Sequence, residues 1–169
     1  MTESHVTEPS RSRLTPVIVA ALCATVTAAV GGSLTDVGPW YQQLHKPAWV
    51  PPNWAFGVIW TTIFALATIS AVHGWRASAG DKARREWLIG LFALNGFLNV
   101  LWSLLFFRMH RPDLALIEVA ALWASIAALI LFQLRRSPVS AALLAPYLVW
   151  VSIAAALNTA ILQMNGPFG

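Results

Sequence analysis

Charged residues are scarce in this chain of 169 residues. Asp, Glu, Lys and Arg together make up 11% of it, whereas 57% is hydrophobic and the mean hydropathy is +0.63. A soluble domain carries roughly 25% charged residues, so this sequence has too few to cover a water-facing surface. The composition excludes an ordinary soluble protein and predicts an integral membrane protein whose apolar side chains face lipid as well as one another.

Cysteine is almost absent, and so are the short motifs of common enzymes. The single Cys23 excludes an intramolecular disulfide and a cysteine metal cluster. The sequence has no glycine-rich phosphate loop, no H-E-x-x-H motif, and no Ser, His and Asp in a recognisable motif context. We therefore expect no metal site, no required cofactor and no conventional catalytic residues. The net charge of +4 comes from basic residues at helix ends, so nucleic acid is not an expected partner.

The chain does contain five long apolar runs, each close to the roughly 20 residues that cross a bilayer. They cover about residues 14–34, 54–75, 87–107, 114–134 and 139–162. Connections after the second run are short, which makes neighbouring helices antiparallel. The predicted fold is an all-α membrane protein, a five-transmembrane-helix bundle in a single domain over residues 14–165. Residues 1–13 are predicted to form a disordered tail, and residues 166–169 a short C-terminal tail.

Basic residues are shared unevenly between the two ends of this bundle. Eight of them lie in the N-terminal tail and in the second and fourth connections. The first and third connections hold only Lys46, Arg108 and Arg111. Because basic connections favour the cytoplasm, the N-terminus is predicted to be cytoplasmic and the first connection to face outward.

The first connection is rich in tryptophan and proline. Its sequence WYQQLHKPAWVPPNWAFGVIW, residues 40–60, holds four of the nine Trp residues. Proline fixes φ and cannot donate a backbone hydrogen bond, so Pro47, Pro51 and Pro52 exclude a regular helix or a central strand. Tryptophan favours the membrane interface. We predict a rigid, non-helical connection at the membrane surface that caps a site.

Two helices carry a face that could line a ligand pocket. Four residues of the third helix share one face by their spacing: Asn95, Asn99, Trp102 and Phe106. Amides in hydrocarbon need partners, so this face is expected to point inward, either for interhelical hydrogen bonds or to orient a ligand. In the fifth helix, Trp150, Ala154 and Leu157 share a face that fits either small-residue helix packing or a flat ligand.

Glu118 is the only carboxylate deep inside a predicted span. Such a residue is by default a candidate functional group, with Asn side chains, the hydroxyl of Ser125 or a ligand as its partner. One carboxylate without a matching buried base makes a poor proton relay, so a structural role stays open.

Three motifs together resemble the TspO/MBR family, which comprises the tryptophan-rich sensory proteins of bacteria and the mitochondrial translocator protein. Residues 40–60 resemble its signature W-Y-x-x-L-x-K-P-x-W-x-P-P-x-W. The run ALNGFLNVLWSLLFF resembles its A-x-N-x-x-W…F-F region, and PYLVWVSIAAALN resembles its P-Y-L-x-W…L-N region. The likeness covers about residues 14–165 with the motifs in the correct order.

This resemblance implies a five-helix bundle, a homodimer, and a porphyrin-type ligand such as protoporphyrin IX held between the helices under the first connection. The implied ligand-binding residues are Phe56, Trp60, Asn99, Trp102, Trp150, Ala154 and Leu157. The implied lid consists of Trp40, Lys46, Pro47, Trp49, Pro51 and Pro52.

The expected function is therefore tetrapyrrole binding in a sensory or regulatory role. Two alternatives stay open: degradation of the porphyrin in light and oxygen, with Trp60 and Trp150 as the reactive side chains, and transport of porphyrins or small apolar ligands. The cholesterol motif of animal relatives requires a basic residue after a tyrosine in the fifth helix, and none follows Tyr147. A sterol-poor bacterial cytoplasmic membrane is therefore the expected location.

Overall fold

The computed structural model describes residues 14–168, in which every regular element is a helix and there is no strand. Five helices in this range are long and apolar enough to cross a membrane, so the predicted all-α, five-transmembrane-helix bundle is confirmed. They are α1 (Thr15–Leu34), α3 (Asn53–Ala77), α4 (Lys82–Ser103) with its π-helical extension η1 (Leu104–Arg108), α5 (Pro112–Leu134) and α6 (Pro138–Asn165). The predicted disordered tail, residues 1–13, lies outside the described residues, as does residue 169.

Proline and aspartate residues set the helix boundaries. Both α5 and α6 start with a proline in the first turn, where a missing N–H costs nothing. The carboxylate of Asp81 accepts a hydrogen bond from the backbone N–H of Arg84 at 3.0 Å and so caps α4. The helix therefore begins at Lys82, five residues before the predicted span. Most of the charged stretch 76–86, predicted to be a loop, is helical.

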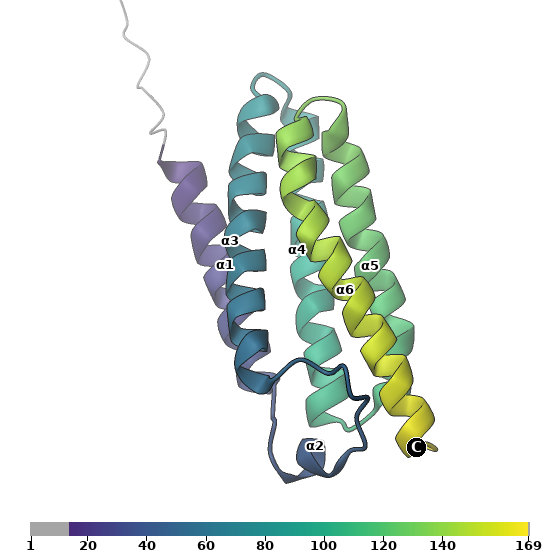
Figure 1. Ribbon diagram of the computed structural model, residues 1–169. Coiled ribbons are helices and arrows are strands. Elements are labelled where there is room, and N and C mark those ends of the chain that lie inside the picture. The colour runs from purple at the N-terminus through teal and green to yellow at the C-terminus, as the bar shows by residue number, and fades with distance from the viewer. Residues whose placement is uncertain (1–13, 169) are drawn as a thin grey trace, which may run out of the picture.

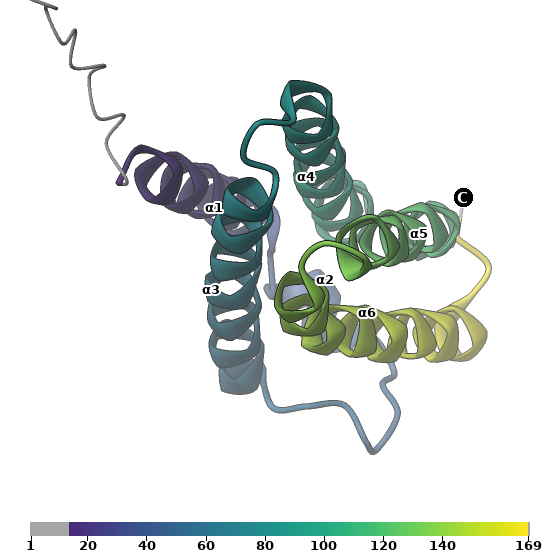
Figure 2. The same ribbon diagram turned by 90° about the horizontal axis from the view of Figure 1, so that it is seen from above.

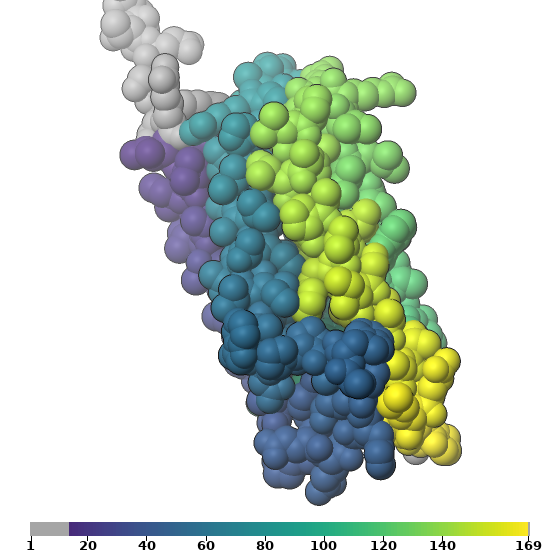
Figure 3. Space-filling model, in the orientation of Figure 1, coloured from purple at the N-terminus to yellow at the C-terminus, as the bar shows by residue number. Residues whose placement is uncertain are grey.

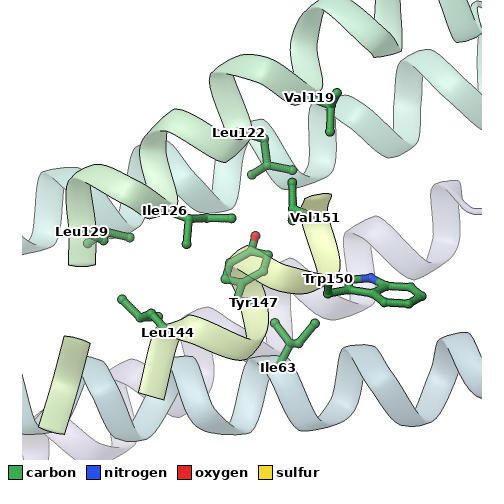
Figure 4. Packing of buried hydrophobic residues seen from close by; sticks show 9 residues of the cluster. All are labelled: Ile63, Val119, Leu122, Ile126, Leu129, Leu144, Tyr147, Trp150 and Val151. Atoms are coloured by element: carbon green, nitrogen blue, oxygen red, sulfur yellow. The ribbon is translucent and has the colours of Figure 1, made fainter. Parts of the chain in front are cut away.

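The five long helices form a closed ring. Seen from above, α1, α3, α6, α5 and α4 follow one another, and α4 contacts α1 again (Figure 2). The most extensive contact between two helices is that of α5 with α6, and Ile63 of α3 packs against them (Figure 4). Ile126, Leu129 and Leu144 are almost fully buried there. In α1, by contrast, Gly31 is the one buried residue.

The connection between α1 and α3 closes one end of this ring. It contains the short helix α2 (Pro39–Gln43) and the non-helical segment 44–52, and we call residues 39–52 the lid. The lid lies at the same end as the C-terminus (Figure 1), and the space-filling view shows it packed against α6 (Figure 3). The predicted absence of helix holds for 44–52 but is wrong for Pro39–Gln43, because Pro39 occupies the first turn, where proline is tolerated.

Candidate functional site

A cavity of about 890 Å³ lies inside the ring, bounded mainly by α1, α3, α4, η1 and α6. This volume is within the range of about 300–1,000 Å³ that is usual for small-molecule sites. None of the described residues that line it is Asp, Glu, Lys, Arg or His. The cavity therefore suits a large, mostly apolar guest and offers no fixed charge to it.

All the residues predicted to bind a ligand meet at this cavity, although they come from three helices. Its lining includes Phe56, Trp60, Asn99, Trp102, Trp150, Ala154 and Leu157. The predicted lid residues lie outside the lining; among lid residues, Tyr41 lines the cavity instead. The geometry brings the predicted set together, and its role in binding stays a prediction.

Trp60 and Trp150 form one aromatic wall of the cavity, between α3 and α6. The ring of Trp60 meets that of Tyr147 edge to face at a centroid distance of 6.0 Å and stacks on Phe64 at 5.7 Å. Trp150 meets Phe56 edge to face at 5.7 Å. Such contacts fix the orientation of the indoles. The wall is therefore a rigid surface on which a flat molecule can lie.

Trp102 belongs to a second aromatic cluster, at the junction of α4 and η1. Its ring stacks on Phe106 at 5.1 Å and meets Phe107 edge to face at 5.9 Å. Both phenylalanines belong to the π-helical extension, and both line the cavity. A π-helical turn is rare and is frequent at functional sites, because it re-aims side chains that an α-helix would point elsewhere.

The sequence left two roles open for the asparagines of α4, namely interhelical hydrogen bonds and the orientation of a ligand. Asn95 donates from Nδ2 to Ser125 Oγ at 2.9 Å, and Asn99 donates to the hydroxyl of Tyr147 at 3.1 Å. Both therefore make interhelical hydrogen bonds. Only Asn99 also lines the cavity, so this residue combines the two expected roles in position, whereas Asn95 ties α4 to α5.

Three residues of the cavity lining carry a buried polar atom that has no hydrogen-bond partner among the described residues. These atoms are Nε1 of Trp102, Nε1 of Trp150 and Oδ1 of Asn158. The amide nitrogen of Asn158 is engaged, since it donates to the carbonyl of Pro112 at 2.9 Å. Buried polar groups are usually paired, so two donors and one acceptor at the wall of one cavity are notable.

Glu118 is 7% exposed, and neither carboxylate oxygen has a hydrogen-bond partner in the described part of the chain. The suggested partner Ser125 is wrong, because its hydroxyl accepts from Asn95 and donates to the carbonyl of Leu122 at 2.7 Å. Glu118 is also outside the cavity lining. The structure therefore does not bring it into the candidate site.

The lid is anchored through its aromatic residues on one side. Tyr41 is buried against Phe107, at a centroid distance of 5.5 Å, and this burial raises the pKa of its hydroxyl. Trp40 stacks on His110 at 4.2 Å. Lys46 Nζ lies 4.4 Å from the centroid of the Tyr41 ring and donates to the carbonyl of Leu44 at 3.2 Å. Its ammonium group therefore stabilises the lid itself.

On its other side the lid is held by the last residue of α6. The side-chain amide of Asn165 donates to the carbonyls of His45 and Ile161, both at 2.8 Å. Its Oδ1 accepts from the backbone N–H of His45 at 2.7 Å and lies 3.3 Å from His45 Nδ1. The three backbone bonds fix the amide orientation, so Nδ1 must carry a proton to act as a donor. This Asn165–His45 latch was not predicted from the sequence.

Sequence reasoning also missed the wall that α1 contributes. Small residues line the cavity from one face of this helix: Ala21, Ala24, Ala28 and Gly31. Their spacing of three and four residues is the signal that could have identified the face. The latch had no such signal, because 120 residues separate its partners.

Comparison with known proteins finds a family model and several relatives that each match most of the chain. The TspO/MBR family model matches residues 18–164. The tryptophan-rich protein TspO of Chlorobaculum tepidum is 38% identical over 159 residues, covering 88% of this chain and 97% of its own. The protein CrtK of Rhodobacter capsulatus is 35% identical, covering 87% and 89%. The translocator protein of Sus scrofa is 30% identical, covering 90% and 94%.

Proposed function

The chain belongs to the TspO/MBR family of membrane proteins, and from this premise we propose that it binds a porphyrin-type tetrapyrrole beneath its lid, in a sensory or regulatory role. The observation that carries this proposal is the 890 Å³ cavity with Trp60, Trp102 and Trp150 in its walls. Each stacked aromatic pair contributes roughly 0.5–1.5 kcal/mol beyond the burial of its area. Several such contacts would hold a flat macrocycle.

The proposed mode of binding is stacking without metal ligation. The described residues that line the cavity include no His, Cys or Met, which are common axial ligands of a porphyrin metal. The cavity lining is also uncharged, so carboxylate groups of a porphyrin would remain at the mouth of the cavity rather than inside it. The unpaired indole N–H groups of Trp102 and Trp150 are the donors we propose for polar atoms of the ligand.

A second candidate function is the oxidation of a bound porphyrin in light and oxygen. It is favoured by the position of Trp60, whose ring lies at the cavity wall and 6.0 Å from that of Tyr147. Tryptophan and tyrosine are among the side chains most easily oxidised by one electron. In this proposal the excited ligand takes one electron from Trp60 or Trp150, and molecular oxygen takes that electron from the reduced ligand and becomes superoxide. The indole radical then recovers an electron from the ligand, which is left oxidised by one electron.

The membrane placement follows from the distribution of charge. We propose a bacterial cytoplasmic membrane with the N-terminus in the cytoplasm, since eight of eleven basic residues belong to the N-terminal side of the bundle. The lid then faces outward. We also propose a homodimer, as the family resemblance implies. Cross-linking in native membranes tests the dimer, and labelling of cysteines placed in the lid tests the orientation.

The deciding experiment is a titration of the detergent-purified protein with protoporphyrin IX in the dark, followed by porphyrin absorbance and tryptophan fluorescence. We expect saturable binding that Trp150→Phe and Trp60→Phe weaken. Trp87→Phe is the matched control, because Trp87 is 68% exposed and lies outside the cavity lining. If binding does not saturate, the tetrapyrrole proposal is wrong.

The same samples are then illuminated in air to separate the two candidates. If the protein only binds porphyrin, the porphyrin absorbance falls no faster than it does in detergent alone. An enzyme shows faster loss of absorbance that Trp60→Phe or Trp150→Phe removes and Trp87→Phe leaves in place. Movement of porphyrin into sealed proteoliposomes above the passive leak would instead favour transport.

A further inference from the structure

A second concave site lies at the end of the bundle opposite the lid, between the last turn of α3 and the first turns of α4. It is lined by Trp75, Gly80, Asp81, Lys82, Arg85, Glu86 and Ile89. Figure 1 places the α3–α4 connection at the far end of the helices from α2. We propose that this site binds the headgroup of an anionic phospholipid.

The central group of the site is the guanidinium of Arg85, which is held against Trp75. Its Cζ atom lies 4.4 Å from the centroid of the Trp75 ring, and its Nε donates to the Trp75 carbonyl at 3.4 Å. Neither Nη atom has a hydrogen-bond partner within the described residues. A guanidinium fixed in this way offers paired donors in one plane, which matches two oxygens of a phosphate group.

The two carboxylates at the site do not neutralise Arg85. Asp81 accepts from the backbone N–H of Arg84, which holds the pKa of Asp81 below its ordinary value, and it also pairs with Arg136 at 2.9 Å. Glu86 pairs with Lys82 at 3.7 Å, and both side chains are largely exposed. An exposed pair of this kind is weak, so Lys82 stays available for an anion.

The depth of the site in the membrane selects a lipid over a free phosphate. Lys82 is the first residue of one candidate span, and Trp75 lies two residues before the end of another. Both therefore lie at headgroup level. Ile89 follows Lys82 and Arg85 on the same face of α4 and is exposed, about two turns further into the bilayer. A phosphate at Arg85 that continues into acyl chains would cover Ile89.

The surrounding charge favours an anionic headgroup over a zwitterionic one. Among the described residues this end carries two acidic side chains, Asp81 and Glu86, against six basic ones: Arg76, Lys82, Arg84, Arg85, Arg135 and Arg136. The lid end carries Asp36 and Asp113 against Lys46, Arg108 and Arg111. Anionic leaflets attract clusters of basic residues next to membrane spans. The proposed site is the one place in this cluster where Trp75, a fixed guanidinium and an exposed apolar side chain meet.

The test measures which lipids stay with the protein. The full chain is reconstituted in equal amounts of phosphatidylglycerol and phosphatidylcholine, transferred to mild detergent, and its retained lipids are counted by native mass spectrometry. We expect a preference for phosphatidylglycerol that Arg85→Gln lowers about fivefold, the effect expected of one cation beside an anionic leaflet. Arg85→Lys, which keeps the charge but loses the paired donors, is expected to lower it less.

Arg135→Gln is the matched control, because it removes the same charge at the same end, from the exposed turn between α5 and α6. Because Arg135 belongs to the surrounding basic cluster but not to the site lining, its loss should lower the preference by less than Arg85→Gln does. An equal loss would reduce the effect to general surface charge and overturn the proposal. If Arg85→Gln lowers the unfolding temperature, Lys82→Gln replaces it as the test variant, because the Lys82 side chain is exposed. The proposal is also overturned if the wild type shows no preference, or if millimolar glycerol phosphate displaces the lipid.

Discussion

The two sides of the helix ring differ in how they are filled. Between α5 and α6, branched and aromatic side chains interdigitate, and 39% of the most apolar window of α5 is buried. In α1 the corresponding share is 6%, and the face that it turns to the cavity consists of small side chains. Both helices are similarly apolar, so hydrophobicity alone does not decide which one packs.

Side-chain size explains this difference. The helices of a membrane bundle are held by van der Waals packing and interhelical hydrogen bonds rather than by exclusion of water. The α5–α6 side has both, including the bond from Asn158 to Pro112. On the α1 side, Ala and Gly leave space inside the ring. Between α5 and α6, large side chains fill the corresponding space. The packed α5–α6 side therefore holds Trp150 in place, while the side of small residues supplies volume for a ligand.

The largest expected effect comes from truncating a buried side chain between α5 and α6. Leu144→Ala removes a buried side chain between α5 and α6 and should destabilise the protein by about 2–5 kcal/mol. Leu22→Ala makes the same chemical change at a 60% exposed position of α1 and should cost less than about 0.5 kcal/mol. Thermal unfolding in one detergent compares the two variants. Equal losses would contradict the contrast between the two sides.

The next prediction concerns a substitution that places a large side chain in the cavity. A Cβ at Gly57 would meet no atom within 4 Å, and this residue lines the cavity. Gly57→Leu should therefore lower the porphyrin affinity at least tenfold, or ~1.4 kcal/mol, without lowering the unfolding temperature. Gly90→Leu is the matched control, because Gly90 is equally unobstructed but lies outside the lining. Unchanged binding by Gly57→Leu would place the ligand outside the cavity.

A smaller effect is expected where the lid meets the packed side. Asn165→Ala removes three hydrogen bonds to the backbone, each worth about 0.5–1.5 kcal/mol, two of which join the lid to α6. Dissociation of porphyrin, measured by stopped-flow transfer to lipid vesicles, should become about tenfold faster. Gln163→Ala, an exposed amide in the same turn of α6, should leave the rate unchanged. An unchanged rate in Asn165→Ala would show that the lid does not limit release.

The sequence predicted these features unequally, for physical reasons. Helix positions follow from runs of apolar residues, so the five spans were found to within a few residues, except that α4 starts five residues early, at Lys82, because Asp81 caps it. Residues that share a helix face, such as Asn99 and Trp102, were also found, because their spacing determines the face. The short helix Pro39–Gln43 was missed because Pro47, Pro51 and Pro52 were taken to exclude a helix from the whole connection, although they lie after this helix. Pro39 itself occupies the first turn, where proline is tolerated.

Contacts between distant segments could not be predicted in the same way. The latch from Asn165 to His45 and the pairing of Ser125 with Asn95 rather than Glu118 depend on the register between helices. That register is set by the packing of many side chains and leaves no local pattern. The same holds for the cavity volume, which depends on the small α1 face meeting a gap in the ring.

The smallest expected effect tests whether the carboxylates of the porphyrin interact with a charged residue when it binds in the cavity. The cavity lining holds no charged residue, and the nearby ammonium of Lys46 is already engaged by the carbonyl of Leu44 and the ring of Tyr41. The dimethyl ester of protoporphyrin IX should therefore bind within about threefold of the free acid, a difference below ~1 kcal/mol. Parallel dark titrations measure both. A loss of tenfold or more would mean that the carboxylates reach a cation, and a matching loss in Lys46→Gln would identify it as the lid lysine.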